Sequence, residues 1–523
     1  MKNDAKLLPD DPVLLKQMLL AERVDLQEVL LEMQSWQHKY NRLLEQFRIS
    51  QKQRFGSSTE TNPYQDQLFD EAEAINTETL EEPVCADESE TEITIAEPRQ
   101  KPKRKPLPAD LPRETVIIDI PESEKTCTCC GHELHKMGEE TSEKLAKIPA
   151  SLKVIKQVRL KYACRHCEQN GTQNSVKIAP VPVSIIPKGI ATASLIAFII
   201  INKFLYALPL YRQETLFEQM GIDLSRQTMS RWMIVSAEAL LRIYAALRQH
   251  LLKQHVIHSD DTPLQVIQAE KSNRYMWVYC SGSDSINTPS FDQRIVLYES
   301  ASREGIHPKT FLQGFTGTLQ CDGYSGYNGV KVQHQGCWAH ARRYFVEADT
   351  ALGKELKSQK IGWALNCIKK LYAIEKRIAD KSVEDRLATR QAESKPLLNS
   401  YKKWLDDTAS RPILSEKLKD AVNYSLNQWE ELSYYINDGR LNIDNNRAER
   451  AIKPFVIGRK NWLFSNTVNG ANASAILYSI VQTAKANGVR PLEYLTHLLT
   501  ELPKMAEGES VEHLLPWNVQ LKS

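Results

Sequence analysis

The sequence predicts a multidomain α/β protein in which helical segments precede and follow one strand-rich domain. Its 523 residues suffice for about two to four domains. The composition, 42% hydrophobic and 25% charged residues, is typical of a globular chain. The spacing of apolar residues is helical at first, becomes strand-like from about residue 254, and is helical again from Ala339.

Residues 1–55 are predicted to form an N-terminal coiled-coil helix. Over residues 13–50, apolar side chains follow a 4-3 spacing that the polar residues Arg23 and Gln37 interrupt. Such a seam favours a homo-oligomer, and the alternative is an amphipathic helix that packs on its own chain. The apolar positions are Leu19, Leu26, Leu30, Met33, Tyr40, Leu44 and Phe47.

Residues 56–105 are predicted to be a disordered acidic linker that ends in a basic run. No Lys or Arg occurs between Arg54 and Arg99, whereas Asp and Glu are frequent and aromatic residues are few. The alternative is a mimic of DNA that occupies a basic groove of the free protein. Residues 99–105 (RQKPKRK) are either a phosphate contact or a solvated linker. The net charge is only +2, so the basic residues are concentrated in other parts of the chain.

Residues 106–185 carry two CxxC pairs, which predict a zinc-ribbon-like domain. Two thiolates from each pair complete the tetrahedral set of a structural Zn²⁺ site, and four protein ligands leave no open coordination position. The strand-like residues 144–164 separate the two pairs. Cys129 and His132 are further ligand candidates. The predicted zinc ligands are Cys127, Cys130, Cys164 and Cys167.

Residues 186–250 are predicted to be a helical, DNA-binding region with a helix-turn-helix. A helix over Glu214–Met220 precedes a turn with Gly221, and a second helix starts at Ser225, a favourable N-cap residue. Other helical hairpins with a glycine turn look similar. The polar and basic side chains at the start of the second helix favour DNA contact. These side chains belong to Arg226, Gln227, Thr228 and Arg231.

The catalytic domain is predicted to consist of residues 251–345 and 441–490. Residues 346–440 are predicted to be a helical insertion in it, and residues 491–523 a C-terminal helix and tail. Acidic residues end the first and fourth strand candidates, where Asp260 and Asp261 follow HVIHS and Asp322 follows TLQC. This order of strands and acids suits a ribonuclease-H-like mixed sheet. The strand candidates are QHVIHSD, RYMWVYCSG, RIVLYES, TLQCDGY and KVQHQGCW.

The stretch Leu441–Phe464 places Glu449 inside a strongly basic helix. The alternative for such a helix is a solvated face of ion pairs. Asp444 is predicted to be the N-cap residue, while Asn445 and Asn446 either cap the helix or bind phosphate. The basic residues that we expect to neutralise DNA phosphates are Arg447, Arg450, Lys453, Arg459 and Lys460.

Asp260, Asp322 and Glu449 are predicted to converge on two divalent metal ions. Phosphodiester cleavage and transesterification need an activated oxygen nucleophile and a stabilised leaving oxygen, which two Mg²⁺ or Mn²⁺ ions ~4 Å apart provide. Mg²⁺ prefers carboxylate oxygens. Each acid alone is better explained as an exposed or capping carboxylate, so the prediction depends on all three together with the motifs around them.

Four motifs, DNNRAERAIKPFVIGRKNWLF, HSDDTP, CDGYSGY and CWAHARRYF, resemble those of the DDE transposases of the insertion-sequence-66 type. The resemblance extends in order from about residue 10 to the end of the chain. It implies a ribonuclease-H-like fold, Asp260, Asp322 and Glu449 as the catalytic acids, a zinc-binding segment that binds DNA, and small accessory proteins encoded by the same element.

The pair Cys337 and His340 resembles a C(2)H element that several DDE transposases carry between the second and third acids. The alternative is a buried cysteine and a hydrogen-bonded histidine. Trp338 either stacks on an unpaired base or fills the core, and Arg342 is a further supporting candidate.

The function predicted from these features is DNA transposition. Such an enzyme binds the terminal inverted repeats of its element, cuts to free 3′-hydroxyls, and joins them to double-stranded target DNA. The alternatives are a hydrolytic nuclease of the same fold and a zinc and helix-turn-helix regulator. The N-terminus lacks an apolar signal core and the most apolar run is too short to cross a bilayer. We therefore expect a bacterial, cytoplasmic protein that acts at the nucleoid, without a membrane partner.

The zinc prediction can be tested by changing Cys164 to Ser. The purified wild-type protein should contain one Zn²⁺ with Zn–S distances of ~2.3 Å. The variant should lose the metal and bind DNA more weakly, because three ligands hold the local hairpin less firmly. Metal analysis measures the zinc content, X-ray absorption spectroscopy measures the Zn–S distances, and a DNA-binding assay compares the variant with the wild-type protein. Wild-type protein without stoichiometric zinc would refute the prediction.

Overall fold

The computed structural model describes most of the second half of the chain and scattered parts of the first. The chain divides into two units, Met1–Leu80 with Pro182–Ser523, and Glu81–Val181. The predicted acidic linker and the cysteines Cys127, Cys130, Cys164 and Cys167 lie outside the described residues. The described residues are single positions between 11 and 44, and 152–159, 161–162, 177–178, 181–187, 189–270, 273–284, 286–287, 289–352, 359–411 and 415–521.

In the unit Glu81–Val181, the strands β1 (Lys161–Tyr162) and β2 (Lys177–Ile178) form an antiparallel pair in which Tyr162 lies opposite Lys177. The cysteines Cys164 and Cys167 fall between these two strands in the sequence. Of the residues 144–164 expected to be strand-like, residues 152–159 have no regular secondary structure, and the described strand there is β1.

The described positions near the N-terminus are helical. Leu26, Met33 and Tyr40 follow one another at every seventh position, and all three side chains are exposed. A heptad stripe exposed in a single chain is available to a second helix. The coiled coil and the oligomer that it implies stay predictions.

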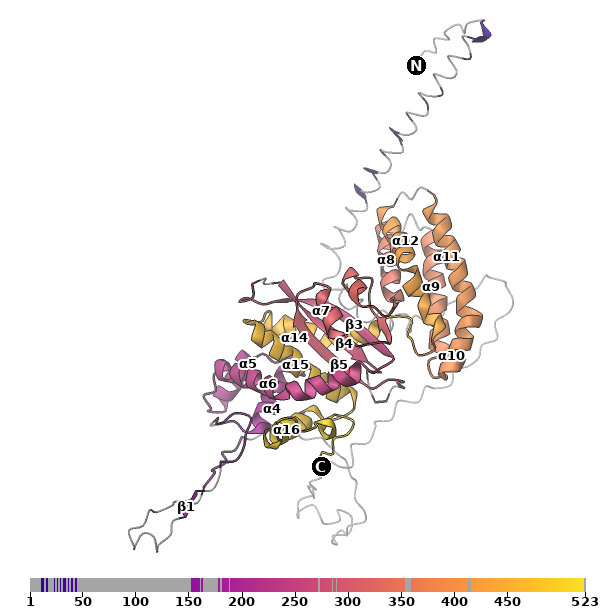
Figure 1. Cartoon of the computed structure of the whole chain (residues 1–523). Coiled ribbons are helices and arrows are strands. Elements are labelled where there is room, and N and C mark those ends of the chain that lie inside the picture. Colours follow the sequence, from indigo (N-terminus) through magenta and orange to yellow (C-terminus); the bar gives the residue numbers. More distant parts are fainter. Residues whose placement is uncertain are drawn as a thin grey trace, which may run out of the picture. The chain divides into compact units, whose positions relative to one another are not determined.

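The core of the larger unit is a five-stranded mixed sheet with the order β5-β4-β3-β6-β7 (Figure 1). The three N-terminal strands form antiparallel pairs, whereas β6 is parallel to β3 and β7 is parallel to β6. Aromatic and β-branched side chains fill β4 and β5 and are buried there, as suits a central sheet. The strands are β3 (Val256–Gln265), β4 (Asn273–Ser281), β5 (Ile295–Ala301), β6 (Thr318–Gln320) and β7 (Gln333–Gln335).

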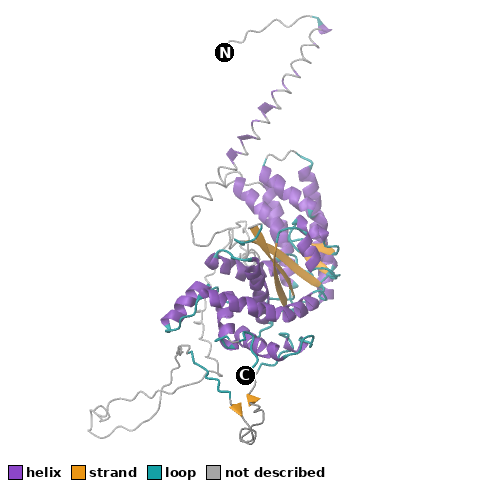
Figure 2. Cartoon of the chain, turned by 60° about the vertical axis from the view of Figure 1, so that its left-hand side comes forward, coloured by secondary structure: helices purple, strands orange, loops and turns teal. Residues whose placement is uncertain are grey.

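Helices cover both faces of this sheet (Figure 2). Successive strand residues point to opposite faces, and Tyr298 lies opposite Val278 in the register, so Tyr298 and Tyr279 point to different faces. The Tyr298 hydroxyl donates to the carbonyl of Ala451 in α14, whereas the Tyr279 ring stacks on Phe311 of α7 at 3.9 Å. The helices next to the sheet are α4 (Ala193–Phe204), α5 (Leu210–Gln219), α6 (Arg226–Leu251), α7 (Ile306–Phe311), α14 (Asn446–Trp462), α15 (Val468–Ala486) and α16 (Pro491–Glu501).

A helical subdomain with its own hydrophobic core lies between β7 and α14 in the sequence. It starts with α8 at Trp338, ahead of the expected boundary at residue 346, because Trp338, Ala341 and Phe345 already belong to its core. Trp338 donates its indole N–H to the carbonyl of Leu432 at 2.7 Å. Its helices are α8 (Trp338–Leu352), α9 (Gln359–Arg377), α10 (Val383–Thr389), the π-helical turn η4 (Arg390–Ser394), α11 (Lys395–Ala409), α12 (Glu416–Asn427), α13 (Trp429–Ser433) and η5 (Tyr434–Asn437).

Three short 3₁₀ helices complete the described secondary structure: η2 (Ser325–Gly329), η6 (Leu502–Lys504) and η7 (Glu512–Leu514). None of the helices in the described part of the chain combines the length and apolar character that crossing a bilayer requires.

The helix α15 covers the edge strand β5 and satisfies its backbone. Thr483 Oγ1 accepts a hydrogen bond from the N–H of Val296 at 3.0 Å and donates to its carbonyl at 2.8 Å, and Ser479 Oγ accepts from the N–H of Tyr298 at 2.8 Å. An edge strand exposes such groups as a template for pairing with other chains. The two hydroxyls close this edge in place of a sixth strand.

Changing Thr483 to Val should therefore destabilise the fold. The substitution keeps the side-chain shape but leaves a buried N–H and a buried carbonyl of Val296 without their partner, which costs about 2 kcal/mol. Thermal unfolding should show a lower Tm. The matched control is Thr500→Val on α16, whose exposed hydroxyl donates to the carbonyl of Thr496. An equal loss of Tm in both variants would contradict this role of Thr483.

Candidate active site

Strand pairing brings Asp260 and Asp322 to one face of the sheet. The register of the parallel pair β3–β6 places His258 opposite Gln320, and Asp260 and Asp322 each follow two residues later. Residues two apart on a strand share a face. The two acids therefore lie side by side where β3 and β6 leave their pairing.

The segment before α14 is fastened to the same face. Gln320 donates from Nε2 to the carbonyls of Asn442 at 2.8 Å and Asp444 at 2.7 Å. Asn445 donates from Nδ2 to the carbonyl of Ser259 at 2.8 Å, and its Oδ1 lies 3.2 Å from His258 Nδ1. These contacts fix the start of α14, and Glu449 in its first turn is 2% exposed.

The pKa values of the acids reflect this crowding. Burial raises the pKa of Asp260 well above its usual value, and the negative charges of Glu449, Asp322 and Asp261 raise it further. Burial also raises the pKa of Asp322, although the N–H of Tyr324 donates to its carboxylate at 3.1 Å. Carboxylates that share a buried site repel one another unless a cation neutralises them. Carboxylate oxygens are the ligands that a hard divalent ion such as Mg²⁺ or Mn²⁺ prefers, although within the described part of the chain the oxygens of Asp260, Asp322 and Glu449 do not all lie within 4.8 Å of one another.

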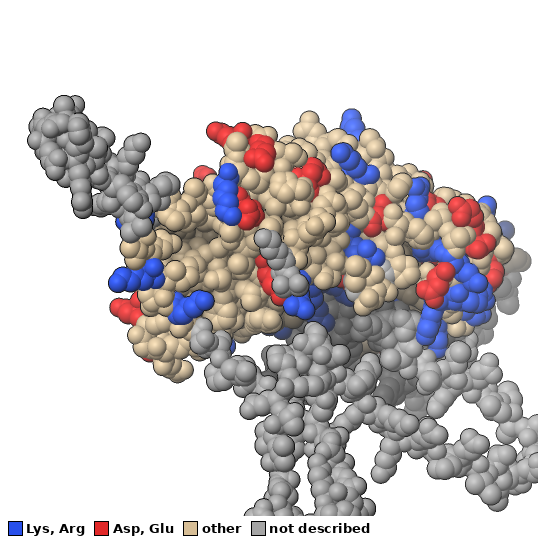
Figure 3. Space-filling model, turned by 90° about the horizontal axis from the view of Figure 1, so that it is seen from below, with Lys and Arg blue, Asp and Glu red and all other residues tan. Residues whose placement is uncertain are grey.

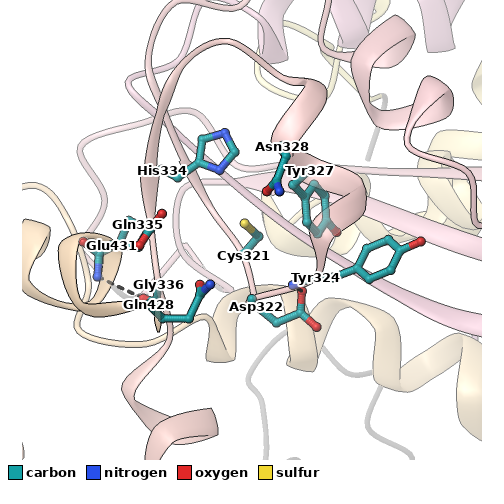
Figure 4. Close-up of a pocket in the computed structure, with 11 residues that line it drawn as sticks. Cys321, Asp322, Tyr324, Tyr327, Asn328, His334, Gln335, Gly336, Gln428 and Glu431 are labelled. Carbon is teal, nitrogen blue, oxygen red and sulfur yellow. Dashed lines mark hydrogen bonds between the residues drawn. The ribbon is translucent and has the colours of Figure 1, made fainter. Parts of the chain in front are cut away.

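Asp322 also lines a small cavity (Figure 4). Its walls come from the end of β6, from η2, from β7 and from α13, and its volume is about 20 Å³, room for about one water molecule. The Gly336 N–H donates to the carbonyl of Glu431 at 3.0 Å and closes one wall. The cavity leaves space beside Asp322 that is large enough for one water molecule.

Asp261 points to the opposite face of the sheet from Asp260. Its carboxylate lies 3.1 Å from Arg303 Nε, and the Arg303 guanidinium stacks over the rings of Tyr275 and Tyr324. Burial raises the pKa of Asp261 to about 6 even though Arg303 lowers it. The structure therefore separates the two adjacent aspartates into different environments.

Residues 188–473 match the family described as "Transposase IS66 family". The chain belongs to this IS66 transposase family. Three other parts match related descriptions: residues 124–168 match "zinc-finger binding domain of transposase IS66", residues 42–116 match "Transposase C of IS166 homeodomain", and residues 479–517 match "IS66 C-terminal element".

Similar proteins occur in Sinorhizobium fredii. The uncharacterized protein y4hP is 33% identical over 437 residues, which cover 80% of this chain and 77% of that protein. The uncharacterized protein y4jD is 34% identical over 427 residues, 79% of this chain and 81% of that protein. No solved structure matches the chain significantly. The resemblance seen in the motifs is thus confirmed at the level of the family.

A second group of donor atoms surrounds Glu449 in this IS66-family chain. Donor atoms of Cys337, His340 and Glu449 lie within 4.8 Å of one another, and His340 Nδ1 is 3.7 Å from a Glu449 oxygen. Burial, followed by the charge of Arg343, lowers the pKa of His340 to about 3, so its ring is neutral. Cys337 Sγ accepts a hydrogen bond from the N–H of Asn445 at 3.2 Å. The pair Cys337 and His340 thus contacts the first turn of α14.

Two basic residues predicted to contact phosphates are held by an acid instead. Arg447 is 5% exposed, lies 2.8 Å from Asp284, and donates to the carbonyls of Gly282 and Ser281. Arg450 contacts the other oxygen of Asp284 and is more exposed. Arg447 therefore ties α14 to the end of β4 and is not presented to a ligand.

The other basic residues of α14 lie closer to the surface. Arg459 donates to Thr262 Oγ1 at 3.1 Å and to the carbonyl of Pro263. Lys453 is half-buried and Lys460 is exposed. On the face seen in Figure 3, basic and acidic side chains are interspersed, so the charge pattern of that face does not mark a DNA path by itself.

The helix-turn-helix prediction agrees with α5, the turn and α6. Ser225 caps α6 and its Oγ accepts from the N–H of Thr228 at 3.3 Å, and Gly221 has φ 77° in the turn. The second helix is longer than expected and runs to Leu251. The exposed side chains at its start include Arg226, Gln227 and Arg231.

Sequence reasoning missed Asp284, His258 and Gln320. Asp284 lies in a loop with no motif around it, and its role depends on a partner 163 residues away. In the sequence, His258 and Gln320 look like ordinary buried strand residues. Only the register of β3 with β6 shows that both face the start of α14. The prediction of Asp444 as the N-cap residue of α14 is wrong, because Asn445 occupies that position. The Asn445 side chain makes no capping bond and instead joins α14 to β3, while Asp444 Oδ1 accepts from the N–H of Asn446 at 3.1 Å.

Metal binding should distinguish Asp260 from Asp261. Mg²⁺ should raise the Tm of the wild-type protein and of Asp261→Asn, but not that of Asp260→Asn, because only Asp260 shares a face with the other acids. Differential scanning calorimetry with and without Mg²⁺ measures this. An equal Mg²⁺-induced shift in Asp260→Asn would move the metal site elsewhere.

The metal-free proteins should differ in the pH dependence of stability. The pKa of Asp260 is higher in the folded than in the unfolded protein. The protonated carboxyl therefore favours the folded state at low pH, and this contribution is lost as the pH rises through the folded-state pKa. Asp260→Asn should therefore raise the metal-free Tm at pH 8 more than at pH 4. An unchanged difference between the two pH values would contradict this.

Proposed function

We propose that this protein is a DDE-type transposase that binds the terminal inverted repeats of its element, cleaves one strand at each end, and joins the 3′-hydroxyls to target DNA. The observation that carries the proposal is the meeting of three acids from distant parts of the sequence: Asp260 on β3, Asp322 after β6 and Glu449 on α14. Their mutual effect on the pKa of Asp260 supports a shared cation site.

The proposal includes a ribonuclease-H-like fold for the catalytic domain. Three antiparallel strands followed by two parallel ones in the order β5-β4-β3-β6-β7 support it. The first acid lies on the central strand, the second follows the neighbouring parallel strand, and the third comes from a helix on the same face.

Asp260, Asp322 and Glu449 would hold two Mg²⁺ or Mn²⁺ ions, which supply activation of the attacking oxygen and stabilisation of the leaving oxygen. Other residues of this chain position the acids and exclude water. The hydrogen bonds of Gln320 and Asn445 set the position of Glu449, and burial of Glu449 excludes bulk water from that side of the site. Neutral His340 and Cys337 restrict the first turn of α14 without adding charge to it.

DNA would be bound by several parts of the chain. Arg226, Gln227 and Arg231 on α6 are candidates for contact with the inverted repeats, and Lys453 and Lys460 for contact with phosphates near the acids. The zinc-finger segment, with Cys127, Cys130, Cys164 and Cys167 as zinc ligands, would add affinity. Because two DNA ends have to be brought together, the enzyme would act as a homo-oligomer, with accessory proteins of the element as further partners.

A joining assay tests the proposal. Purified protein, Mg²⁺ and DNA ends from the encoding locus should give strand-transfer products. Asp322→Asn and Glu449→Gln should lose both cleavage and joining by about 1,000-fold or more, since the metal ions supply several kcal/mol of transition-state stabilisation.

Asp261→Asn is the matched control and should keep substantial activity. Cleavage without joining would instead indicate a nuclease of the same fold. Full activity in Glu449→Gln would refute the proposed active site.

A further inference from the structure

A second cavity lies between the candidate DNA-reading helix and the far end of α14. Its walls come from α4, α6, the last turn of α14 and the first turns of α15, which lie together in Figure 1. Its volume of about 120 Å³ is close to the ~150 Å³ of an engineered cavity that takes benzene. It therefore has room for one six-membered ring. Its lining includes Lys203, Ser230, Trp462, Phe464, Thr467 and Ser474.

Lys203 places a positive charge in this cavity. Its ammonium lies 5.5 Å from the ring centre of Phe204 and 6.0 Å from that of Trp462. Among the residues that the structure describes, no carboxylate forms an ion pair with it. Burial lowers the pKa of Lys203 to about 8, so the ammonium persists at neutral pH. A charged donor enclosed by aromatic rings favours a ligand that offers both an oxygen acceptor and a flat face.

The end of α14 adopts a strained turn at the mouth of the cavity. Leu463 has φ 65° and ψ −52°, and the N–H of Phe464 donates to the carbonyl of Trp462 at 2.8 Å. Such a γ-turn is rare for a residue with a side chain, and strained backbone of this kind concentrates at functional sites. The turn leaves Phe464 43% exposed at the cavity.

The position of the cavity suits bound DNA. Ser230 lies on α6 next to the exposed Arg231. Trp462 and Glu449 belong to the same helix, and thirteen residues of α-helix span about 20 Å. The cavity is thus lined both by the helix proposed to contact the inverted repeats and by the helix that carries Glu449.

We propose that this cavity binds one unpaired pyrimidine nucleotide of the bound DNA. The base lies against the aromatic side chains, and an oxygen of the base accepts a hydrogen bond from Lys203. This inference rests on the proposed function, because it takes DNA as the ligand. Stacking on aromatic side chains tolerates any base, and the small volume is what favours a pyrimidine.

Fluorescence anisotropy with the full chain tests the inference. One ligand is a labelled oligothymidylate of about 12 nucleotides, and the other is an abasic strand with the same number of phosphates. The wild-type protein should bind the thymidylate about tenfold more tightly than the abasic strand. Lys203→Met and Phe464→Ala should each lower that preference at least threefold without weakening binding of the abasic strand.

Both variants should fold, because Lys203→Met keeps the side-chain length and Phe464 is partly exposed; thermal unfolding checks this. The matched control is Ile457→Ala, an exposed residue of α14 outside the cavity, which should keep the full preference. Equal affinity of the wild-type protein for both strands would overturn the nucleotide site while leaving DNA binding and the proposed function intact. Equal weakening of both strands in Lys203→Met would also overturn it, because Lys203 would then contact only the backbone.

Discussion

The attachment of one short segment to two parallel strands determines where the acids meet. Residues 442–445 receive hydrogen bonds from Gln320 and give one to β3, across a separation of 122 residues between Gln320 and Asn442. The helical subdomain is inserted between these parts of the sequence, yet it has its own hydrophobic core. Because most of its side chains pack in this core, the subdomain can be large while Gln320 and Asn445 hold the start of α14 against the sheet.

The same attachment creates an electrostatic cost that the fold does not remove. Gathering several carboxylates in a buried place is unfavourable without a cation, and among the residues that the structure describes no Lys or Arg forms an ion pair with Asp260. Arg303 pairs with Asp261 on the other face, and Arg447 and Arg450 pair with Asp284. Asp322 is partly compensated by the charges of Arg303 and Arg343, whereas the crowding of Asp260 is what the proposed divalent ions would relieve.

The sequence predicted the elements better than their contacts. The strands around Asp260 and Asp322, the helix with Glu449 and the Ser225 cap follow from local patterns, since periodicity and capping residues act over a few positions. The partner of Arg447 and the side of the sheet that Asp261 faces depend on register and on a loop acid, which no local pattern encodes. The sequence allows two roles for Trp338, stacking on a base or filling the core. Its burial and its hydrogen bond to the carbonyl of Leu432 show that it belongs to the core.

Asp284 gives the surface of α14 an unexpected property. Its carboxylate already pairs with the guanidinium groups of the buried Arg447 and the exposed Arg450. A phosphate that approaches Arg450 therefore replaces one anion by another, and the free energy gained is only the difference between the two. Fewer counterions are released in such an exchange than the number of arginines implies, so non-specific DNA should be held loosely here. Because Asp284 competes with phosphates in this way, the site should favour ligands that reach Asp260, Asp322 and Glu449 over ligands that only carry negative charge.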